Sequence, residues 1–194
     1  MKRVATWVLP LAVISLFSFA AISRAEELRS GPQPGEMLGA YEVTKVAGAP
    51  DDGVAEGQQL CYRCKMGNRP VVMIFSRKPD RALARLVKRL DNVVAQNKDD
   101  HNMASFVSLL GDKPDQLANA SKNIVDETKA KNVAFVVPKE QPNGPETYKI
   151  NPEVETTVLI YVKGKVKANH AIPPGGLNDT TADQIVADTA KILK

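Results

Sequence analysis

The sequence predicts an α/β fold with a mixed β-sheet, helices on both faces of the sheet, and a β-hairpin and a helix at the carboxyl end. Short continuous apolar runs, typical of buried strands, alternate with segments whose apolar residues recur every three or four positions. Near the carboxyl end, two further apolar runs flank a short turn that contains glycine. The alternation predicts parallel strands first, and the hairpin adds antiparallel ones.

The beginning of the chain has the pattern of a secretory signal peptide. Lys2 and Arg3 precede the apolar run Val4–Ile22, and Ser23–Ala25 forms a small-residue cleavage site. A membrane anchor is the alternative, because the run is long enough to span a bilayer, but its proline and serines dilute it. We therefore expect a cleaved signal peptide over residues 1–25 and a periplasmic or secreted protein, with no membrane attachment beyond the export signal.

The charge balance gives no support for nucleic-acid binding. The chain has 26 basic and 22 acidic residues, which corresponds to a net charge of +4 and a pI of about 9.0. Three of the basic residues lie in the leader, so cleavage would leave 23 basic residues against 22 acidic ones. Without a basic excess we expect no nucleic-acid partner. The rest of the chain has a suitable length for one domain.

The segment before the domain is rich in glycine and proline and shows no apolar periodicity. We expect a flexible tether over residues 26–39 and a single domain over residues 40–194. The domain begins with a short strand at Tyr41–Val46, which ends at the turn-forming residues Gly48–Gly53. The segment Cys61–Pro70 follows and leads into the main body of the fold.

The main body is expected to alternate strands and helices before its hairpin. The expected elements are a strand at Val71–Phe75, a helix from Pro79 with an apolar stripe over Leu83–Val94, a strand at Ala104–Leu110, a helix from Leu117 to about Asn132, and a strand at Val133–Val137. After a turn-rich connection, the hairpin strands are expected at Thr157–Val162 and Lys165–Ala171. The last helix is expected to begin near Thr180 or Thr181, because Thr181–Gln184 is typical of a capping box.

Three of these segments together resemble a known superfamily. They are the buried strand Val71–Phe75 with its helix, Phe135–Glu140 before Tyr148–Asn151, and the strand–Lys–Gly–strand hairpin Thr157–Val166. The chain resembles the thioredoxin-like superfamily over about Leu38–Leu193, especially its exported branch of peroxiredoxins and thiol reductases. The resemblance implies a thioredoxin-like three-layer fold, protein thiols or disulfides as partners, and no cofactor.

The sequence departs from the family at two positions that affect function. In thioredoxins a Cys-x-x-Cys pair follows the first central strand, where helix N–H groups stabilise a thiolate. Here that position is Ser76–Asp80, without cysteine. The Pro, Thr and Cys pattern of peroxiredoxins is also absent, which argues against a peroxidase. Thr156 stands where the family has a cis-proline, so the docking of a substrate strand and the exclusion of metal are both open.

The two cysteines of the chain, Cys61 and Cys64, admit three hypotheses. The leading one is thiol–disulfide exchange with other proteins, because this spacing lets one thiol resolve a mixed disulfide formed by the other. The second is a non-catalytic binding module with a structural Cys61–Cys64 disulfide, which would bind a protein partner through the Arg77–Arg89 face. The third is a metal-binding thiol protein, but a closed zinc site needs four ligands, and only His101 and His170 could assist the two cysteines.

The place of the cysteines in the chain sets them apart from the usual thioredoxin site. They precede the strand Val71–Phe75, whereas the usual site lies beyond the carboxyl end of that strand. We therefore expect the pair at the amino end of the strand, unless its loop folds back over the sheet.

A basic cluster occupies the position where the family has its cysteines. Arg77, Lys78 and Arg81 lie at the start of a helix, where N–H groups and the helix dipole favour anions. An anion site or a surface for an acidic partner is one hypothesis. Basic residues continue over Arg85–Arg89, and this continuation favours an ordinary solvated helix face.

Overall fold

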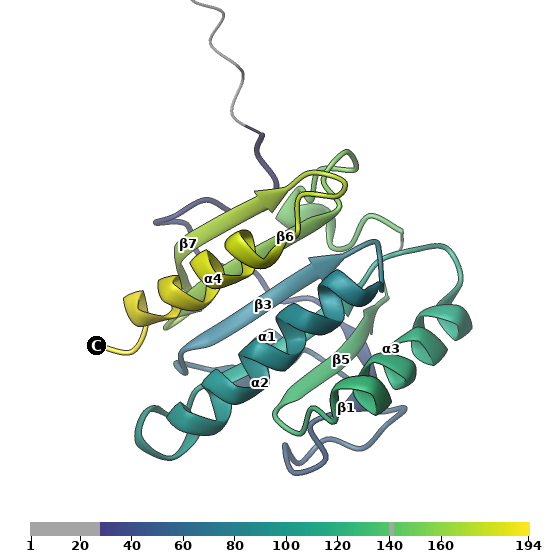
Figure 1. Cartoon of the computed structure of the whole chain (residues 1–194), viewed down its shortest axis with the longest axis horizontal. Coiled ribbons are helices and arrows are strands. Elements are labelled where there is room, and N and C mark those ends of the chain that lie inside the picture. Colours follow the sequence, from purple (N-terminus) through teal and green to yellow (C-terminus); the bar gives the residue numbers. More distant parts are fainter. Residues whose placement is uncertain (1–27, 140–141) are drawn as a thin grey trace, which may run out of the picture.

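The computed structural model describes residues 28–139 and 142–194, so the predicted signal peptide lies outside the described residues. The described part contains one seven-stranded sheet with the strand order β2-β1-β5-β4-β3-β6-β7 (Figure 1). The strands are β1 (Val43–Gly48), β2 (Gln59–Leu60), β3 (Val71–Ser76), β4 (Ala104–Leu109), β5 (Val133–Pro138), β6 (Thr156–Val162) and β7 (Lys165–Ile172).

Helices cover both faces of this sheet. The α-helices are α1 (Tyr62–Met66), α2 (Arg81–His101), α3 (Pro114–Thr128) and α4 (Asp179–Asp188), and short 3₁₀ helices lie at η1 (Glu146–Tyr148) and η2 (Thr189–Lys191). The last α-helix begins earlier than expected, because Asn178 is its N-cap and accepts the N–H of Thr181 at 2.9 Å. The expected capping box at Thr181 is therefore wrong.

The sheet is mixed, as the sequence predicted. Strands β3, β4 and β5 are parallel, whereas β6 runs antiparallel to β3 and β7 antiparallel to β6. The turn between β6 and β7 is Lys163–Gly164, and both residues have positive φ, as a two-residue hairpin turn requires. Strand β1 pairs antiparallel with β5, and the two-residue strand β2 was not anticipated.

The two faces of the sheet are covered unequally. From β3 to β4 to β5 the chain moves in one direction across the sheet, so right-handed crossovers place α2 and α3 on the same face. Helix α4 packs beside α2 on that face, and Figure 1 shows α2, α3 and α4 in front of the sheet with α1 behind it. The short helix α1, η1 and irregular chain cover the opposite face. The prediction of an α/β fold with helices on both faces is confirmed.

Strand β3 joins the two hydrophobic layers. Its residues are all buried, and alternate side chains enter opposite layers, with Val72 and Ile74 under α2 and Met73 and Phe75 on the other side. The second layer is aromatic, because Tyr41, Tyr62, Phe106 and Tyr148 pack there with Phe75. A strand that is buried on both faces is apolar at almost every position. The continuous apolar run therefore predicted β3 correctly.

The described part of the expected tether, residues 28–39, is packed against the sheet. Ser30 is buried, with its hydroxyl oxygen 2.6 Å from that of Thr157. The Leu38 N–H donates to Gly164 O at 2.8 Å, and Met37 forms an isolated bridge with Lys165. The Gly35 N–H also donates to Val166 O at 2.9 Å, and the Val166 N–H donates to Glu36 O at 3.0 Å. This stretch therefore satisfies backbone groups of β7, and the expectation of a flexible tether is corrected for it. No described helix is both long enough and apolar enough to cross a membrane.

Candidate functional site

The candidate site is a disulfide between Cys61 and Cys64, at the start of α1. Their Cα atoms are 5.2 Å apart, and Cys61 is the N-cap residue of the helix. The N–H of Cys64 donates to the Cys61 sulfur at 3.1 Å. Cys64 is exposed and Cys61 half-buried. The disulfide is therefore open to a partner, and the Cys64 N–H is placed to stabilise a thiolate on Cys61 after reduction.

Strand pairing places this disulfide near the carboxyl edge of the parallel strands. Leu60, just before the pair, lies opposite Val43, and Val43 lies opposite Pro138 at the end of β5. Through the paired strands, Pro138 is level with Arg77, one residue beyond β3. The pair therefore does not lie at the amino end of β3, and the stated exception, a loop that folds back over the sheet, applies. Leu60 and β3 are four strand spacings apart, which is about 19 Å along the sheet.

The chain reaches β3 by folding back across the sheet. Helix α1 packs Tyr62 and Met66 into the aromatic layer, and the ring of Tyr62 lies 5.4 Å from that of Phe106. After the helix, Asn68 O accepts the N–H of Lys163 at 3.3 Å, next to the turn at the amino end of β3. The fold-back explains how a pair that precedes β3 in sequence begins near the opposite edge.

A buried polar network anchors α1. Lys45 in β1 has a side chain that is only 1% exposed, and its Nζ donates to Asp52 at 2.8 Å and to the carbonyls of Ala49 and Val54. The other carboxylate oxygen of Asp52 accepts the hydroxyl of Tyr62, the residue after Cys61. Burial, followed by the bond to Asp52, raises the pKa of Tyr62, so its phenol stays protonated and keeps donating.

A depression of about 660 Å³ opens beside Cys61. It is lined by Ala40, Tyr41, Glu42, Cys61 and Lys139. Lys139 and Glu42 form an exposed ion pair at 3.2 Å on its rim. A partner segment could therefore approach the sulfur of Cys61 from this side.

The usual thioredoxin position at the end of β3 is closed by hydroxyl groups. Ser76 and Thr156 are fully buried, and their hydroxyl oxygens lie 3.1 Å apart. Thr156 is paired with Ser76 in the sheet and stands where the family has its cis-proline. The position thus holds a neutral hydrogen-bonded pair in place of a sulfur facing a proline.

The basic cluster at the start of α2 is already compensated in part. Asp80 caps the helix by accepting the N–H groups of Ala82 and Leu83. Burial opposes ionisation of Asp80, but the bond from Leu83 and the contact with Lys78 outweigh it and lower its pKa. Lys78 lies 3.1 Å from Asp80, so the helix N-terminus and this lysine share one carboxylate. This arrangement weakens the hypothesis of an anion site.

The other two members of the cluster lie apart from this cap. Arg77 is half-buried, and its Nη1 donates to Pro142 O at 3.2 Å. Burial lowers the pKa of Arg77. Arg81 is exposed at the start of α2. The three basic residues therefore face different surroundings and do not form one binding site with the disulfide.

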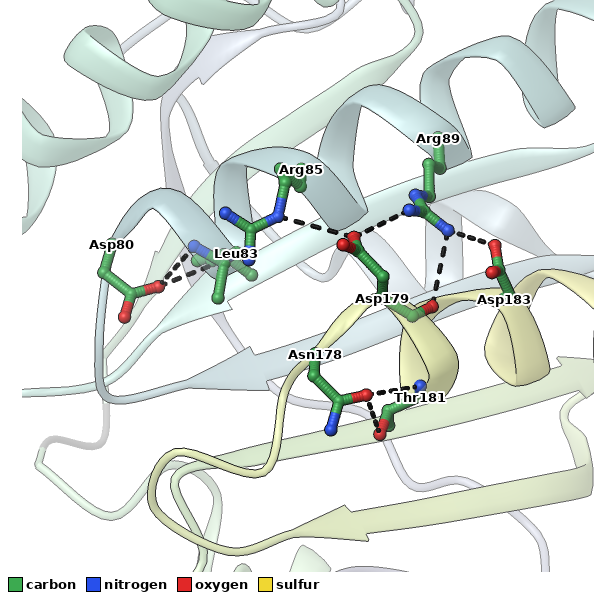
Figure 2. A network of polar contacts seen from close by, with 9 residues as sticks. Asp80, Leu83, Arg85, Arg89, Asn178, Asp179, Thr181 and Asp183 are labelled. Atoms are coloured by element: carbon green, nitrogen blue, oxygen red, sulfur yellow. Dashed lines mark hydrogen bonds and ion pairs between the residues drawn. The ribbon is translucent and has the colours of Figure 1, made fainter.

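Further along α2, two arginines are bound to α4. Figure 2 shows Arg85 and Arg89 directed toward the carboxylates of Asp179 and Asp183. The Arg89–Asp179 distance is 2.7 Å, and Arg89 also binds Asp183. This helix face therefore joins two elements of the same chain, which reduces the surface that the binding-module hypothesis assigned to the arginines of α2.

The two histidines are remote from the sulfurs and from each other. His170 is half-buried in β7, with Nε2 3.1 Å from Asp188, and burial lowers its pKa. His101 is exposed at the end of α2. Among residues 28–139 and 142–194, no three metal-ligating side chains come together. The structure therefore adds no ligands to the two sulfurs that the metal hypothesis requires.

Sequence reasoning missed the residues that hold the site. Lys45 had a signal, because it interrupts an otherwise alternating strand at an inward position. Asp52 lies in a turn where acidic residues are common, so only the fold showed that it meets Lys45 and Tyr62.

Taken together, the sheet order, the hairpin and the covering helices define a thioredoxin-like fold. Solved structures support this assignment. A candidate protein disulfide isomerase from Bacteroides thetaiotaomicron aligns with a TM-score of 0.62 and 12% identity, covering 86% of this chain and 94% of that one. A candidate thiol:disulfide interchange protein DsbE from Chlorobium tepidum aligns with a TM-score of 0.59 and 16% identity, covering 84% and 99%.

A similar match is found with reduced Prx3 from Vibrio vulnificus, solved in complex with H₂O₂. It aligns with a TM-score of 0.60 and 10% identity, covering 81% of this chain and 99% of that one. No protein-family model matches the sequence, and no curated protein sequence matches it either. At these identities the comparisons establish the fold, and the site must supply the argument for function.

Proposed function

We propose that this protein exchanges disulfides with other proteins through Cys61 and Cys64. The observation that carries the proposal is an exposed Cys-x-x-Cys disulfide near the carboxyl edge of a thioredoxin-like sheet. Proteins of similar fold include candidates for a disulfide isomerase and a thiol:disulfide interchange protein, which supports the same chemistry.

A purely structural role explains the disulfide less well. The cysteines are three positions apart, and the loop that they close is therefore very short. The chain-entropy treatment assigns about 2 kcal/mol to such a loop, against about 4.7 kcal/mol for a loop of 100 residues. The network of Lys45, Asp52 and Tyr62 already anchors α1, so the fold has little need of a covalent staple there.

The proposed reaction begins with the reduced protein. The Cys61 thiolate attacks one sulfur of a partner disulfide, a mixed disulfide forms, and the other partner sulfur leaves as a thiolate. The Cys64 thiolate then attacks the Cys61 sulfur, releases the second partner thiolate, and forms the Cys61–Cys64 bond. The partner gains two electrons, and the protons from the two protein thiols pass to the partner thiolates. A dithiol partner drives the same steps in reverse.

Cys61 is assigned as the attacking residue for two reasons. Its sulfur accepts the Cys64 N–H, a bond that favours the thiolate form. It also lines the depression that can admit a partner segment. Cys64, one helical turn away and more exposed, is placed to resolve the mixed disulfide.

A redox titration with thiol alkylation and mass readout tests the proposal. We expect a potential above about −300 mV and modification of both thiols in the native reduced protein. A lower potential, with neither thiol modifiable in the native state, would identify a structural bridge. In a second arm, Cys64→Ser should accumulate a mixed disulfide with a peptide disulfide substrate, while Cys61→Ser should not.

We also propose that residues 1–25 are a cleaved signal peptide and that the mature protein works in the periplasm or outside the cell. The basic start, the apolar run and the small-residue cleavage site support this proposal. An oxidising compartment would let the disulfide persist. Intact-mass measurement of the protein recovered from a secreting host should show loss of the first 25 residues, and a mass that retains them would contradict the proposal.

A further inference from the structure

One exposed apolar side chain lies close to the disulfide helix. Among the described residues, Met37 is the one large apolar side chain that is exposed, at 63%. Its Cε lies 3.3 Å from the point that a Cβ on Gly164 would occupy, and the Arg63 guanidinium meets that same point. Arg63 lies between the two cysteines in sequence. The exposed methionine and the disulfide helix thus meet at the β6–β7 turn.

The side chains around Met37 are basic. Lys163 and Lys165 flank Gly164 and are both exposed, and Lys165 is bridged to Met37. Within residues 28–139 and 142–194, neither lysine nor Arg63 forms an ion pair. The neighbouring acid, Glu36, turns its carboxylate onto the N–H of Gln33 at 2.6 Å. Three cations therefore lie around an apolar side chain, and none of the three forms an ion pair among the described residues.

The charge of Arg63 also lacks compensation beneath the surface. Its Nε is buried and has no hydrogen-bond partner among the described residues, and the same holds for the hydroxyl of Tyr161. Tyr161 lies within electrostatic range of both Arg63 and Arg69. Between α1 and the β6–β7 turn there is thus a buried arginine N–H without an acceptor and a buried hydroxyl without a partner among the described residues.

We propose that Met37, Arg63, Lys163 and Lys165 form a docking surface for the partner protein, and that it selects acidic segments. We call these four residues the Met37 surface. The proposed occupant is an extended polypeptide segment that carries Asp or Glu and one apolar side chain close to its reactive cysteine. The inference rests on the proposed disulfide exchange and adds the class of substrate that the site prefers.

The charge and the apolar side chain of this segment each match a feature of the Met37 surface. Carboxylates of the segment would pair with the two lysines and the arginine, and an apolar side chain would cover Met37, whose flexible thioether adapts to varied shapes. Because the lysines are exposed, their attraction acts mainly on the association rate and weakens with salt. The cysteine of a docked segment would lie beside α1, within reach of the disulfide.

The test compares three peptides in a stopped-flow reaction with the full-length reduced protein. Each peptide carries one leucine and one cysteine joined to thionitrobenzoate, and the residues flanking the cysteine are Asp, Ser or Lys. Attack of the protein thiolate on the peptide sulfur releases thionitrobenzoate, which absorbs in the visible range. At low ionic strength we expect the Asp peptide to react about tenfold faster than the Lys peptide, with the gap closing in about 0.5 M salt.

Matched variants show whether the Met37 surface causes the preference. The double variant Lys163→Asp and Lys165→Glu should lose it, and Asp suits position 163 because it tolerates a positive φ. The control, Lys113→Asp with Lys194→Glu, reverses two exposed lysines on the side of α3 and α4 and should keep the preference. Met37→Gln should slow all three peptides by a similar factor, because it removes the apolar contact and leaves the charges.

Reaction with neutral 2,2′-dithiodipyridine reports the reactivity of the thiols themselves, and all variants should match the wild type. Equal rates for the Asp and Lys peptides, or a preference that survives in Lys163→Asp with Lys165→Glu, would overturn the docking surface and leave disulfide exchange intact. If no peptide reacts while dithiodipyridine does, the proposed function fails, and the docking surface fails with it.

Discussion

The disulfide region and the end of β3 lie at the same edge of the sheet, yet they are built in opposite ways. At the disulfide, Cys64 is exposed and the supporting Lys45–Asp52 pair is buried below it. At the end of β3, Ser76 and Thr156 are buried and the charged residues Lys78 and Asp80 lie outside them. In the first region an exposed sulfur lies over a buried ion pair, whereas in the second a buried neutral hydroxyl pair lies beneath exposed charged side chains.

This difference shows that a cysteine pair can lie at the carboxyl edge of the sheet without following the central strand β3. In open α/β sheets, binding sites lie in the loops at the carboxyl ends of the parallel strands. Here the pair comes to that edge through β2, because α1 folds back across the aromatic layer before β3 begins. The position after β3 holds no cysteine, and the fold is kept.

The largest expected effect comes from removing the sulfur at the disulfide region. Cys61→Ser should lower the rate of peptide disulfide exchange by at least about a hundredfold, because the Cys64 thiol that remains lacks the N–H bond made to the Cys61 sulfur and has no second thiol to complete the exchange. The free energy of unfolding should fall by only about 2 kcal/mol, since the closed loop is short. Stopped-flow kinetics and urea denaturation measure the two effects. A large loss of stability with an unchanged exchange rate would instead show that the disulfide is structural.

A second prediction concerns the base of the disulfide region. Asp52→Ala should destabilise the protein by about 3 kcal/mol, because it leaves the Lys45 ammonium buried without its counter-charge and removes the acceptor of the Tyr62 hydroxyl. Its exposed neighbour offers a control, and Asp51→Ala should change stability by less than about 0.5 kcal/mol. Similar urea midpoints for the two variants would show that the network does not anchor α1.

A substitution at the end of β3 should lower the free energy of unfolding by less, and the loss should depend on pH. Asp80→Ala should cost about 1 kcal/mol, the usual effect of losing an N-cap side chain. The folded-state pKa of Asp80 is lowered, so its stabilising effect is present above the unfolded pKa of about 3.9 and is lost as the pH falls through the folded value. Denaturation at pH 7 and at lower pH should show the difference from wild type shrinking. Exchange activity should not change.

The smallest effect is expected on the arginine face of α2. Arg89→Ala removes two ion pairs to α4, but the groups are largely exposed, so stability should fall by less than about 1 kcal/mol. Peptide exchange should match that of the wild type at every salt concentration. A clear loss of partner binding without loss of stability would favour the non-catalytic binding module over the disulfide exchange proposed here.

The sequence predicted the fold through patterns that act locally. The run Val71–Phe75 is apolar at every position because both faces of β3 are covered, and the Lys163–Gly164 turn fits a two-residue hairpin. The prediction of a flexible tether was wrong for residues 28–39, because a segment rich in glycine and proline can be flexible or can pack on the edge of a sheet. Ser30 and Met37 pack on β6 and β7 through hydrogen bonds that have no local signature.

The sequence by itself determined the order of the longer strands and helices, the single Cys-x-x-Cys pair and the absence of cysteine after β3. Only the tertiary structure decided where that pair lies, which residues support it and which charges surround it. The reason is that periodicity reports on burial along one segment, whereas register and fold-back join residues far apart in the chain. Leu60 reaches the level of Arg77 through three intervening strands, and no spacing in the sequence records that alignment.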